Sequence, residues 1–270
     1  YKKCNPLVVG DAAVIRKAIK VTGLPLQVHP VSKVSEAKFE FGTIDVYDLK
    51  YTDLDKIEYG KVSALAGDAA FQSIKTAIEL AMNKEVDGTV TAPINKEALN
   101  LAGHHFDGHT EIYAHFTGTK KYAMLLADEF LRVIHVSTHV SLREACDRVK
   151  KDRIIDVTKL IADACKQFGI DDPRIGIAGL NPHSSDNGLF GWEEEKEIIP
   201  AVNELKSMGY NVEGPIPPDT LFAKANCGQY DGCVAMYHDQ GHIPFKVVGF
   251  NWDPETGKMS SVQGVNITLG

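Results

Sequence analysis

The sequence lacks the features that mark several large protein classes. It has no apolar run long enough to span a bilayer, and its first residues, YKKCNPLVVGD, become polar again too soon for a signal peptide. Lys and Arg number 29 against 36 Asp and Glu, for a net charge of −7, so the clustered basic residues that bind nucleic acid are missing. We therefore expect a cytoplasmic protein that binds neither a membrane nor nucleic acid.

Cysteine is scarce, and several well-known glycine-rich motifs are absent. The five cysteines are odd in number and form no C-x-x-C pair, which argues against a disulfide framework and a structural zinc site. No G-x-G-x-x-G, Walker lysine loop or G-x-S-x-G elbow occurs. A standard dinucleotide fold, a P-loop enzyme and an α/β-hydrolase are therefore disfavoured.

What the chain does contain is an alternation of short apolar runs with helical patterns, in 270 residues of which 44% are hydrophobic. This alternation is typical of parallel strands joined by helical crossovers, and it predicts an α/β fold with a mostly parallel sheet. The expected strands are Pro6–Val9, Gly88–Thr91, Leu131–Ser137, Arg174–Leu180 and Gly232–Tyr237. The clearest helices are Gly67–Asn83, Asp152–Phe168 and Glu193–Met208.

Three further segments have weaker patterns. Residues Val28–Tyr59 interleave Thr, Asp, Tyr and Val, and we expect irregular or antiparallel strands that could form a smaller second lobe or an arm. Asn251–Val262 contains proline and glycine and is expected to be a surface loop or hairpin. The three glutamates that open the helix Glu193–Met208 suit the positive end of a helix dipole, and we expect them on a solvated face.

Three histidines share one context. His139, His183 and His238 each follow one of the last three expected strands, in chain order. Ligand sites of open parallel sheets lie outside the carboxyl ends of the strands, so the three side chains could converge there. Neutral imidazole is a favoured ligand of zinc and its neighbours. Any one of them alone is better explained as a polar loop residue that hydrogen-bonds to the backbone, and their shared placement is what predicts a metal site.

Other motifs offer polar groups that could bind or react. GHTE places His109 and Thr110 near an expected helix start, a possible phosphate cradle. Asn95 in TAPINKEAL is a plausible N-cap, and a purely structural role is as good an explanation. Asp219 and Asp239 could orient a histidine, bind a cofactor or move a proton, although Asp219 could simply cap a helix. The residues thus indicate a metal-assisted enzyme acting on small anionic substrates.

Seven motifs in a fixed order resemble a known family. They are TAPINKEAL, GHTE, STHVSLRE, GLNPHSSDNGLFGWEE, GPIPPDTLF, MYHDQGHIPFK and GVNITLG. From about Gly60 to its last residue the chain closely resembles the 4-hydroxythreonine-4-phosphate dehydrogenase family of vitamin B6 biosynthesis. The resemblance implies a two-lobed α/β/α sandwich similar to isocitrate and isopropylmalate dehydrogenases, with residues 1–270 forming one family unit of two intertwined lobes whose boundary stays open.

The resemblance also implies a metal and a nicotinamide cofactor. The metal ligands of the family match His139, His183 and His238, and the family shares them across a dimer interface, so a homodimer with a shared active site is expected. One divalent cation per site is implied, either zinc, cobalt, manganese or magnesium, together with NAD or NADP.

Substrate contacts carry over in the same way. The phosphate and substrate contacts of the family match His109, Thr110, Lys246 and Asn266. The catalytic acid–base group is expected among Asp219, Asp239 and Lys246. The two carboxylates are favoured because a carboxylate near a metal stays ionised, whereas Lys246 has a competing anionic partner.

The implied reaction is oxidation of the C3 hydroxyl of 4-hydroxy-L-threonine 4-phosphate by NAD, followed by decarboxylation. The insertion NWDPETGKMSSVQ between Phe250 and Gly264 departs from the B6-pathway members. It resembles a paralogous branch that acts on D-threonate or D-erythronate 4-phosphate and gives dihydroxyacetone phosphate. The chain also looks trimmed at both ends relative to the family. A metal-dependent hydrolase and an inactive phosphate-binding module are the alternatives from other classes.

Overall fold

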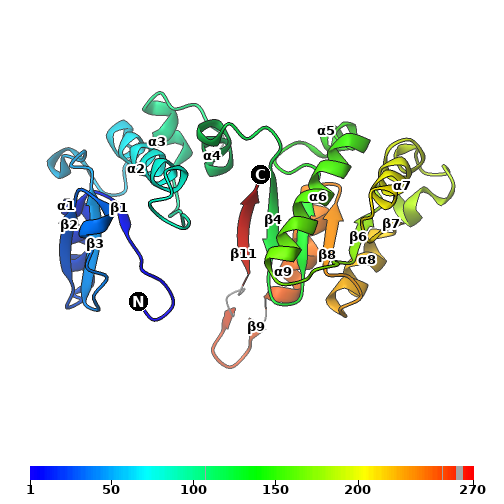
Figure 1. Cartoon of the computed structure of the whole chain (residues 1–270). Helices are drawn as coiled ribbons and strands as arrows, with labels where there is room; N and C mark the ends of the chain where they lie inside the picture. Colours follow the sequence, from blue (N-terminus) through cyan, green and yellow to red (C-terminus); the bar gives the residue numbers. More distant parts are fainter. Residues whose placement is uncertain (107, 251, 260–263) are drawn as a thin grey trace. The chain divides into compact units, whose positions relative to one another are not determined.

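The computed structural model describes residues 1–106, 108–250, 252–259 and 264–270. They divide into two compact units, Tyr1–Thr119 and Lys120–Gly270, drawn in Figure 1 from blue to red along the chain. Each unit has its own sheet and its own core of buried side chains. No helix within these described ranges is both long enough and apolar enough to cross a membrane.

The first unit is built on a three-stranded parallel sheet in the order β1-β3-β2. Its elements are β1 (Val8–Gly10), α1 (Ala12–Thr22), β2 (Gln27–Val31), η1 (Val34–Glu36), β3 (Thr43–Asp48), η2 (Leu54–Lys56), α2 (Ala64–Met82), α3 (Lys96–Leu101) and α4 (His109–Thr117). Residues 32–42 return the chain to the end of the sheet at which β2 begins. Strand β3 starts at that same end and therefore runs parallel to β2. The irregular or antiparallel strands predicted for Val28–Tyr59 are therefore wrong, because β2 and β3 are regular parallel strands of the first sheet.

Helix α2 forms much of the core of this unit, as its apolar periodicity predicts. Phe71 and Ile78 lie on its buried face and pack in one cluster with Leu99 of α3. A side chain at Gly67 of α2 could not be accommodated, because its Cβ would lie 2.1 Å from the carbonyl oxygen of Ala98. The two helices can approach this closely only because the position is glycine.

The strand predicted for Gly88–Thr91 is not formed, and residues 88–95 have no regular secondary structure. Val90 is the one large apolar side chain of Gly88–Thr91 and is fully exposed, so these four residues have no apolar face to bury against a sheet. The N-cap predicted beside it is confirmed. Asn95 accepts a hydrogen bond through Oδ1 from the backbone N–H of Ala98 at 2.9 Å, where α3 begins.

The second unit is built on a six-stranded sheet in the order β11-β4-β5-β8-β6-β7. Strands β5, β8, β6 and β7 are parallel, and β4 runs antiparallel to both of its neighbours. The elements are β4 (Ala123–Ala127), β5 (Arg132–His135), α5 (Leu142–Asp147), α6 (Lys151–Gln167), β6 (Ile175–Ala178), η3 (Pro182–Asp186), η4 (Glu194–Ile198), α7 (Ile199–Ser207), β7 (Val212–Ile216), α8 (Pro218–Asn226), β8 (Gly232–Ala235), α9 (His238–Gly249), β9 (Trp252–Asp253), β10 (Lys258–Met259) and β11 (Val265–Leu269).

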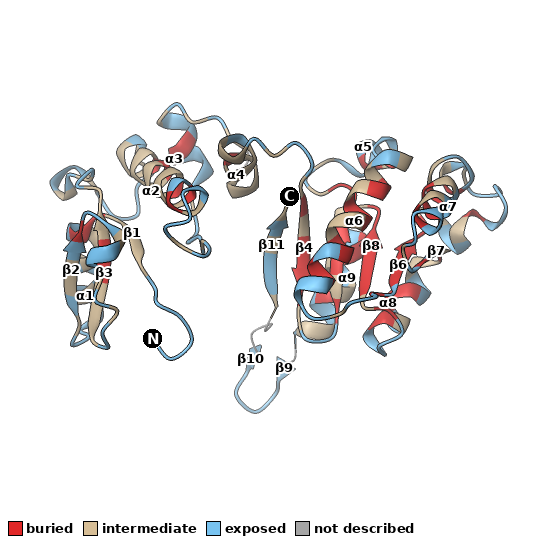
Figure 2. Cartoon of the chain, viewed as in Figure 1, coloured by how far each residue is buried: buried red, intermediate tan, exposed pale blue. Residues whose placement is uncertain are grey.

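Helices cover both faces of this sheet (Figure 1). One core cluster joins α6 and α7 to strand residues that include Ile134, and a second joins α8 and α9 to strand residues that include Val133. Because neighbouring residues of a strand point to opposite faces, the central strands are buried on both sides, as the red strands of Figure 2 show. The predicted α/β fold with a mostly parallel sheet is confirmed, and β5, β6 and β8 lie within three of the predicted strand ranges.

Two other expectations for this unit have mixed outcomes. The helix predicted at Glu193–Met208 begins as the π-helical segment η4 and continues as α7. Its acidic start is not simply solvated, because Glu194 is only 1% exposed and accepts hydrogen bonds from the preceding loop. The hairpin predicted for Asn251–Val262 is present as the antiparallel pair β9 and β10, while Asn251 and residues 260–262 lie outside the described residues.

Candidate active site at the carboxyl edge of the sheet

The loops that carry the three candidate histidines leave the sheet at one edge. Strands β5, β8 and β6 are parallel neighbours, so their carboxyl ends lie together. His139 lies in the loop after β5, His238 is the first residue of α9 after β8, and His183 lies in η3 after β6. The structure therefore places them at three neighbouring strand exits, and their role as metal ligands stays a prediction.

His139 and His238 are close to each other. Their ring centroids are 5.8 Å apart, and both side chains line an open pocket of about 430 Å³ together with Thr138, Tyr237 and Asp239. Two imidazoles bound to one tetrahedral ion have centroids roughly 5 Å apart, so this pair has the chemistry and spacing of two ligands of one cation. Within the described part of the chain, no three His, Cys, Asp or Glu side chains are grouped to hold a metal ion.

Asp239 is placed to orient His238. The Nδ1–H of His238 donates to Oδ1 of Asp239 at 2.7 Å, and the Asp239 side chain is 69% exposed. An imidazole that donates from Nδ1 to a carboxylate presents the lone pair of Nε2 outward, which is the arrangement found behind many metal-binding histidines. Of the possibilities raised for Asp239 by the sequence, the geometry favours the orientation of a histidine.

Two further histidines stand beside His238, and the sequence analysis did not single them out. His242 stacks on His238 with ring centroids 3.7 Å apart, and its Nδ1–H donates to the His238 carbonyl oxygen at 2.9 Å. His135, on β5, lies 4.7 Å from the His242 ring. Burial, reinforced by His242, lowers the pKa of His135 to about 3, so its ring is neutral at pH 7. The spacing of four between His238 and His242 places both on one helix face, a signal that could have revealed the pair.

His183 lies in a segment with unusual backbone geometry. The five residues from His183 to Asn187 all have positive φ angles, and none is glycine. The left-handed conformation costs roughly 1–2 kcal/mol for each such residue, so the surrounding structure must impose it. The buried carboxylate of Glu194 anchors the start of this loop, accepting from the backbone N–H groups of Leu180 and Asn181 at 2.7 Å each.

The remaining candidates of this unit are not among the residues that line the pocket. Lys246 is exposed on α9, eight residues after His238 and therefore about 12 Å farther along the helix axis. Asp219 is exposed in the first turn of α8, directly after β7. Asn266 lies on β11 at the level of Val133, near the beginning of β5. Within this unit, Asn266 is therefore not brought to the edge that carries the histidines.

The other two candidates, His109 and Thr110, open α4 in the first unit, as the predicted helix start requires. The Nε2 atom of His109 is buried and has no hydrogen-bond partner among the described residues. Burial lowers the pKa of His109, and a hydrogen bond with the Ala92 carbonyl partly offsets this. A phosphate beside the ring would favour its protonated form, which donates from Nε2. This unpaired nitrogen at a helix N-terminus therefore fits an anion.

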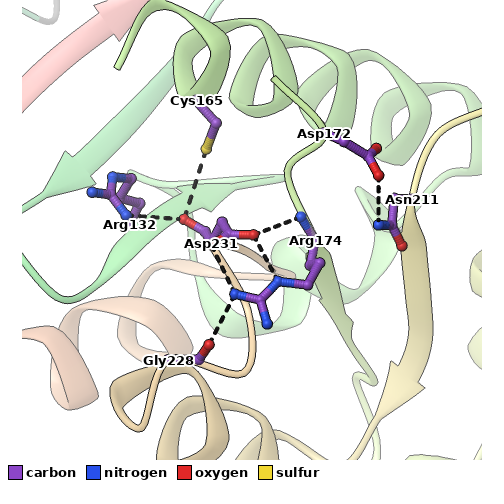
Figure 3. Close-up of polar contacts among 7 residues, drawn as sticks. All are labelled: Arg132, Cys165, Asp172, Arg174, Asn211, Gly228 and Asp231. Atoms are coloured by element: carbon purple, nitrogen blue, oxygen red, sulfur yellow. Dashed lines mark hydrogen bonds and ion pairs between the residues drawn. The ribbon is translucent and has the colours of Figure 1, made fainter. Parts of the chain in front are cut away.

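At the opposite end of the same three strands, where the strands begin, a set of hydrogen bonds around Asp231 connects neighbouring residues (Figure 3). Nε and Nη2 of Arg174, which precedes β6, donate to the Asp231 carboxylate at 2.9 and 3.0 Å. Arg132 of β5 and the thiol of Cys165 both donate to the Asp231 carbonyl oxygen. The Arg174 guanidinium lowers the pKa of Asp231. These contacts tie the starts of β5, β6 and β8 together, so we assign this edge a structural role.

Comparison with known proteins establishes the family. The family model described as "Pyridoxal phosphate biosynthetic protein PdxA" matches residues 2–270. The chain belongs to the PdxA family. The resemblance inferred from its seven motifs is thereby confirmed.

Relatives within the PdxA family carry two different substrate names. A D-threonate 4-phosphate dehydrogenase of Cupriavidus necator is 45% identical over 269 residues, which are 99% of this chain and 77% of the relative. A solved 4-hydroxythreonine-4-phosphate dehydrogenase from Klebsiella pneumoniae is 43% identical, with a TM-score of 0.87 over 98% of this chain and 78% of its own. One from Burkholderia phymatum is 44% identical, with a TM-score of 0.85 over 100% and 78%.

Proposed function

We propose that this chain is an NAD-dependent and divalent-metal-dependent dehydrogenase of D-threonate 4-phosphate. It would oxidise the C3 hydroxyl to a ketone, and the resulting β-keto acid would lose carbon dioxide to give dihydroxyacetone phosphate. The observation that carries the metal-dependent chemistry is the His139–His238 pair at the carboxyl edge of a parallel sheet, in which Asp239 orients His238. The choice of substrate is supported by the Cupriavidus relative, which matches nearly the whole chain.

The proposed metal site uses neutral imidazoles as ligands. His139, His183 and His238 would hold one divalent cation, and Asp239 would keep Nε2 of His238 directed toward it. When bound, the cation supplies Lewis acidity at the C3 hydroxyl and at the β-keto acid, while NAD accepts the hydride. Asp239 is already engaged with an imidazole, so we assign to Asp219 the removal of the hydroxyl proton.

The proposed contacts to the phosphate come from the resemblance to the family. The four residues assigned to bind the phosphate and the rest of the substrate are His109, Thr110, Lys246 and Asn266. The buried, unpartnered Nε2 of His109 supports this assignment, and the positive end of α4 adds to the attraction for an anion. Binding energy from the phosphate would position C3 for reaction.

We also propose that the site is completed in a homodimer. One chain brings His139 and His238 together, and its described residues offer no third ligand grouped with this pair. Large apolar side chains next to the histidine loops are exposed, including Leu142 at 62% and Leu189 at 70%. Exposed apolar groups around an incomplete site fit a surface that a second subunit covers.

A second candidate substrate is 4-hydroxy-L-threonine 4-phosphate, which the names of the two solved relatives favour. It differs from D-threonate 4-phosphate mainly at C2, where it carries an amino group in place of a hydroxyl. Oxidation and decarboxylation would be the same, and the reaction would then belong to pyridoxine biosynthesis. D-Erythronate 4-phosphate is a third substrate of the same size.

The deciding experiment follows NAD reduction by absorbance with each of the three substrates, before and after chelation of divalent metal. We expect the highest kcat/KM with D-threonate 4-phosphate and no activity after chelation. A higher kcat/KM with 4-hydroxy-L-threonine 4-phosphate would move the assignment to that substrate. No NAD reduction with any of the three would refute the proposed dehydrogenase.

His183→Ala tests the ligand assignment, with His105→Ala as its control. His105 is an exposed histidine that hydrogen-bonds Asn100 and has no role in the proposed site. Loss of a ligand should lower both the rate of metal-dependent NAD reduction and the affinity for the metal by at least about 100-fold. The circular dichroism spectrum should not change. If His183→Ala behaves like His105→Ala, His183 is not a ligand.

A further inference from the structure

The loop that carries His183 connects β6 to the π-helical segment η4. Its residues from His183 to Asn187 all have positive φ angles, although none is glycine. Side chains disfavour the left-handed conformation at every one of these positions, so the run persists only because the surrounding structure imposes it. The helix that follows begins with a π-helical turn, a rare feature that is frequent at functional sites. The contacts that impose the left-handed run therefore determine how the loop presents His183.

A buried carboxylate holds the start of this loop. Glu194, the first residue of η4, is only 1% exposed. Its Oε1 accepts from the backbone N–H groups of Leu180 and Asn181 at 2.7 Å each, and its Oε2 accepts from Nδ2 of Asn181 at 2.8 Å. A buried charge is costly unless it is hydrogen-bonded, and hydrogen bonds to a carboxylate are stronger than neutral ones. Glu194 therefore fixes the backbone two residues before His183.

The two ends of the loop also pack against each other. The hydroxyl of Ser185, a residue that is 1% exposed, donates to the carbonyl oxygen of Gly191. A Cβ at Gly191 would lie 2.4 Å from Nδ2 of Asn181, so the far end of the loop touches the amide group that Glu194 holds. Without the Glu194 carboxylate, the N–H groups at the start of the loop would lose their acceptor, and the packing of the far end would lose its support.

The strand end before the loop has separate support from α9. The Gln240 side chain, 7% exposed, accepts through Oε1 from the backbone N–H of Met236 at 2.6 Å. Its Nε2 donates to the carbonyl oxygen of Gly179 at 2.9 Å. The ends of β6 and β8 are thereby joined without a contribution from Glu194. A change at Glu194 should therefore act on the loop and leave the strands in place.

We propose that Glu194 is a positioning residue of the metal site, which keeps the His183 loop in its left-handed conformation before a cation binds. A ligand on an ordered loop binds without the entropy cost of ordering that loop, and groups behind the ligands typically contribute about 10–100-fold in metal affinity. This inference rests on the proposed function, because it takes His183 as a ligand. It holds whichever subunit supplies the other ligands, since Glu194 acts only on the loop of its own chain.

The test compares Glu194→Met with Glu197→Met in the whole chain. Methionine keeps the approximate length and unbranched shape of glutamate and removes its acceptors. Glu197 is a matched control, because it lies in the same π-helical segment with a side chain that is 18% exposed. It accepts through Oε2 from the backbone N–H of Lys151 at 2.8 Å, so its hydrogen bond is to the start of α6 and not to the His183 loop.

Four properties are measured on each variant. They are the dissociation constant of cobalt(II) by calorimetry, the visible absorption of the cobalt form, the melting temperature, and the hydrogen exchange of residues 180–191 in the metal-free protein by mass spectrometry. We expect Glu194→Met to speed this exchange, to raise the cobalt dissociation constant by about 10–100-fold and to alter the cobalt spectrum. Glu197→Met should lower the melting temperature by a comparable amount and leave the other three properties as in the wild type.

If Glu194→Met lowers only the melting temperature, Glu194 has a structural role alone and the inference is overturned. Glu194→Gln keeps an acceptor for the two backbone N–H groups and loses the charge, so it should weaken cobalt binding less than Glu194→Met does. Should Glu194→Met not fold, Glu194→Gln must still weaken cobalt binding relative to Glu197→Gln. Equal binding by these two variants would also overturn the inference.

His183→Ala separates this inference from the proposed function. If the wild type binds cobalt and His183→Ala binds it equally well, the ligand assignment fails, and with it the basis for a role of Glu194. If His183→Ala loses binding but Glu194→Met binds like the wild type, the ligand assignment stands and the positioning role is refuted.

Discussion

Replacing Gly241 with alanine should destabilise the second unit, although alanine is ordinarily the better helix former. Gly241 is buried in α9, between the His238 and His242 positions. A Cβ added there would lie 2.4 Å from Nε2 of His135 and 2.7 Å from Cγ1 of Val133. Both neighbours are on β5 and are themselves at most 1% exposed, so neither can move aside into solvent.

The size of the effect follows from two opposing contributions. Alanine is favoured over glycine inside a helix by up to about 1 kcal/mol. Overpacking of a well-packed interior typically costs about 1–3 kcal/mol, and two contacts below 3 Å place this site toward the upper part of that range. The expected net loss is therefore about 1–2 kcal/mol. In a unit of this size, that corresponds to a fall in melting temperature of about 2–8 °C.

Calorimetric melting of Gly241→Ala, with Gly88→Ala as the control, tests this estimate. No atom lies within 4 Å of a Cβ built on Gly88, so that variant should melt within about 1 °C of the wild type. In a His135→Ala background the ring is gone, and Gly241→Ala should then cost at least about 1 kcal/mol less. A melting temperature for Gly241→Ala equal to or above that of the wild type would refute the packing argument.

Two other predictions concern single hydrogen-bonded side chains. Asp231→Asn should lower the free energy of unfolding by about 1–2 kcal/mol at pH 7, a value reduced because Arg174 is half exposed. The pKa of Asp231 is lowered in the folded state, chiefly by Arg174. Its contribution is therefore complete above the unfolded pKa of about 4 and declines at lower pH. Urea unfolding should show the two proteins converging as the pH falls below about 4, and a constant difference would contradict the ion pair. Asn95→Ala should cost about 1 kcal/mol by removing the N-cap of α3, and Asn95→Ser should restore most of it in the same assay.

Local patterns account for the central strands and the long helices. The apolar runs of β5, β6 and β8 and the helical periodicity of α2 and α6 are contained in short stretches of sequence, so they can be recognised without knowing what they pack against. The strand predicted at Gly88–Thr91 is not formed. The single large apolar side chain of this segment is fully exposed and packs against no other surface. The direction of β3 depends on whether the segment that connects it to β2 ends beside the first or the last residue of β2. No local sequence pattern contains that information.

For the candidate site, the residue types at the strand exits are a property of the sequence, as is their similarity to the PdxA family. The sequence alone therefore predicted a set of imidazoles at the carboxyl edge of a sheet. Only the tertiary structure decided that His139 pairs with His238, that His242 and His135 stand beside them, and that Gln240 joins two of the loops. These contacts depend on the strand order β5-β8-β6. That order is set by how the helices pack on both faces of the sheet, which involves residues far apart in the chain.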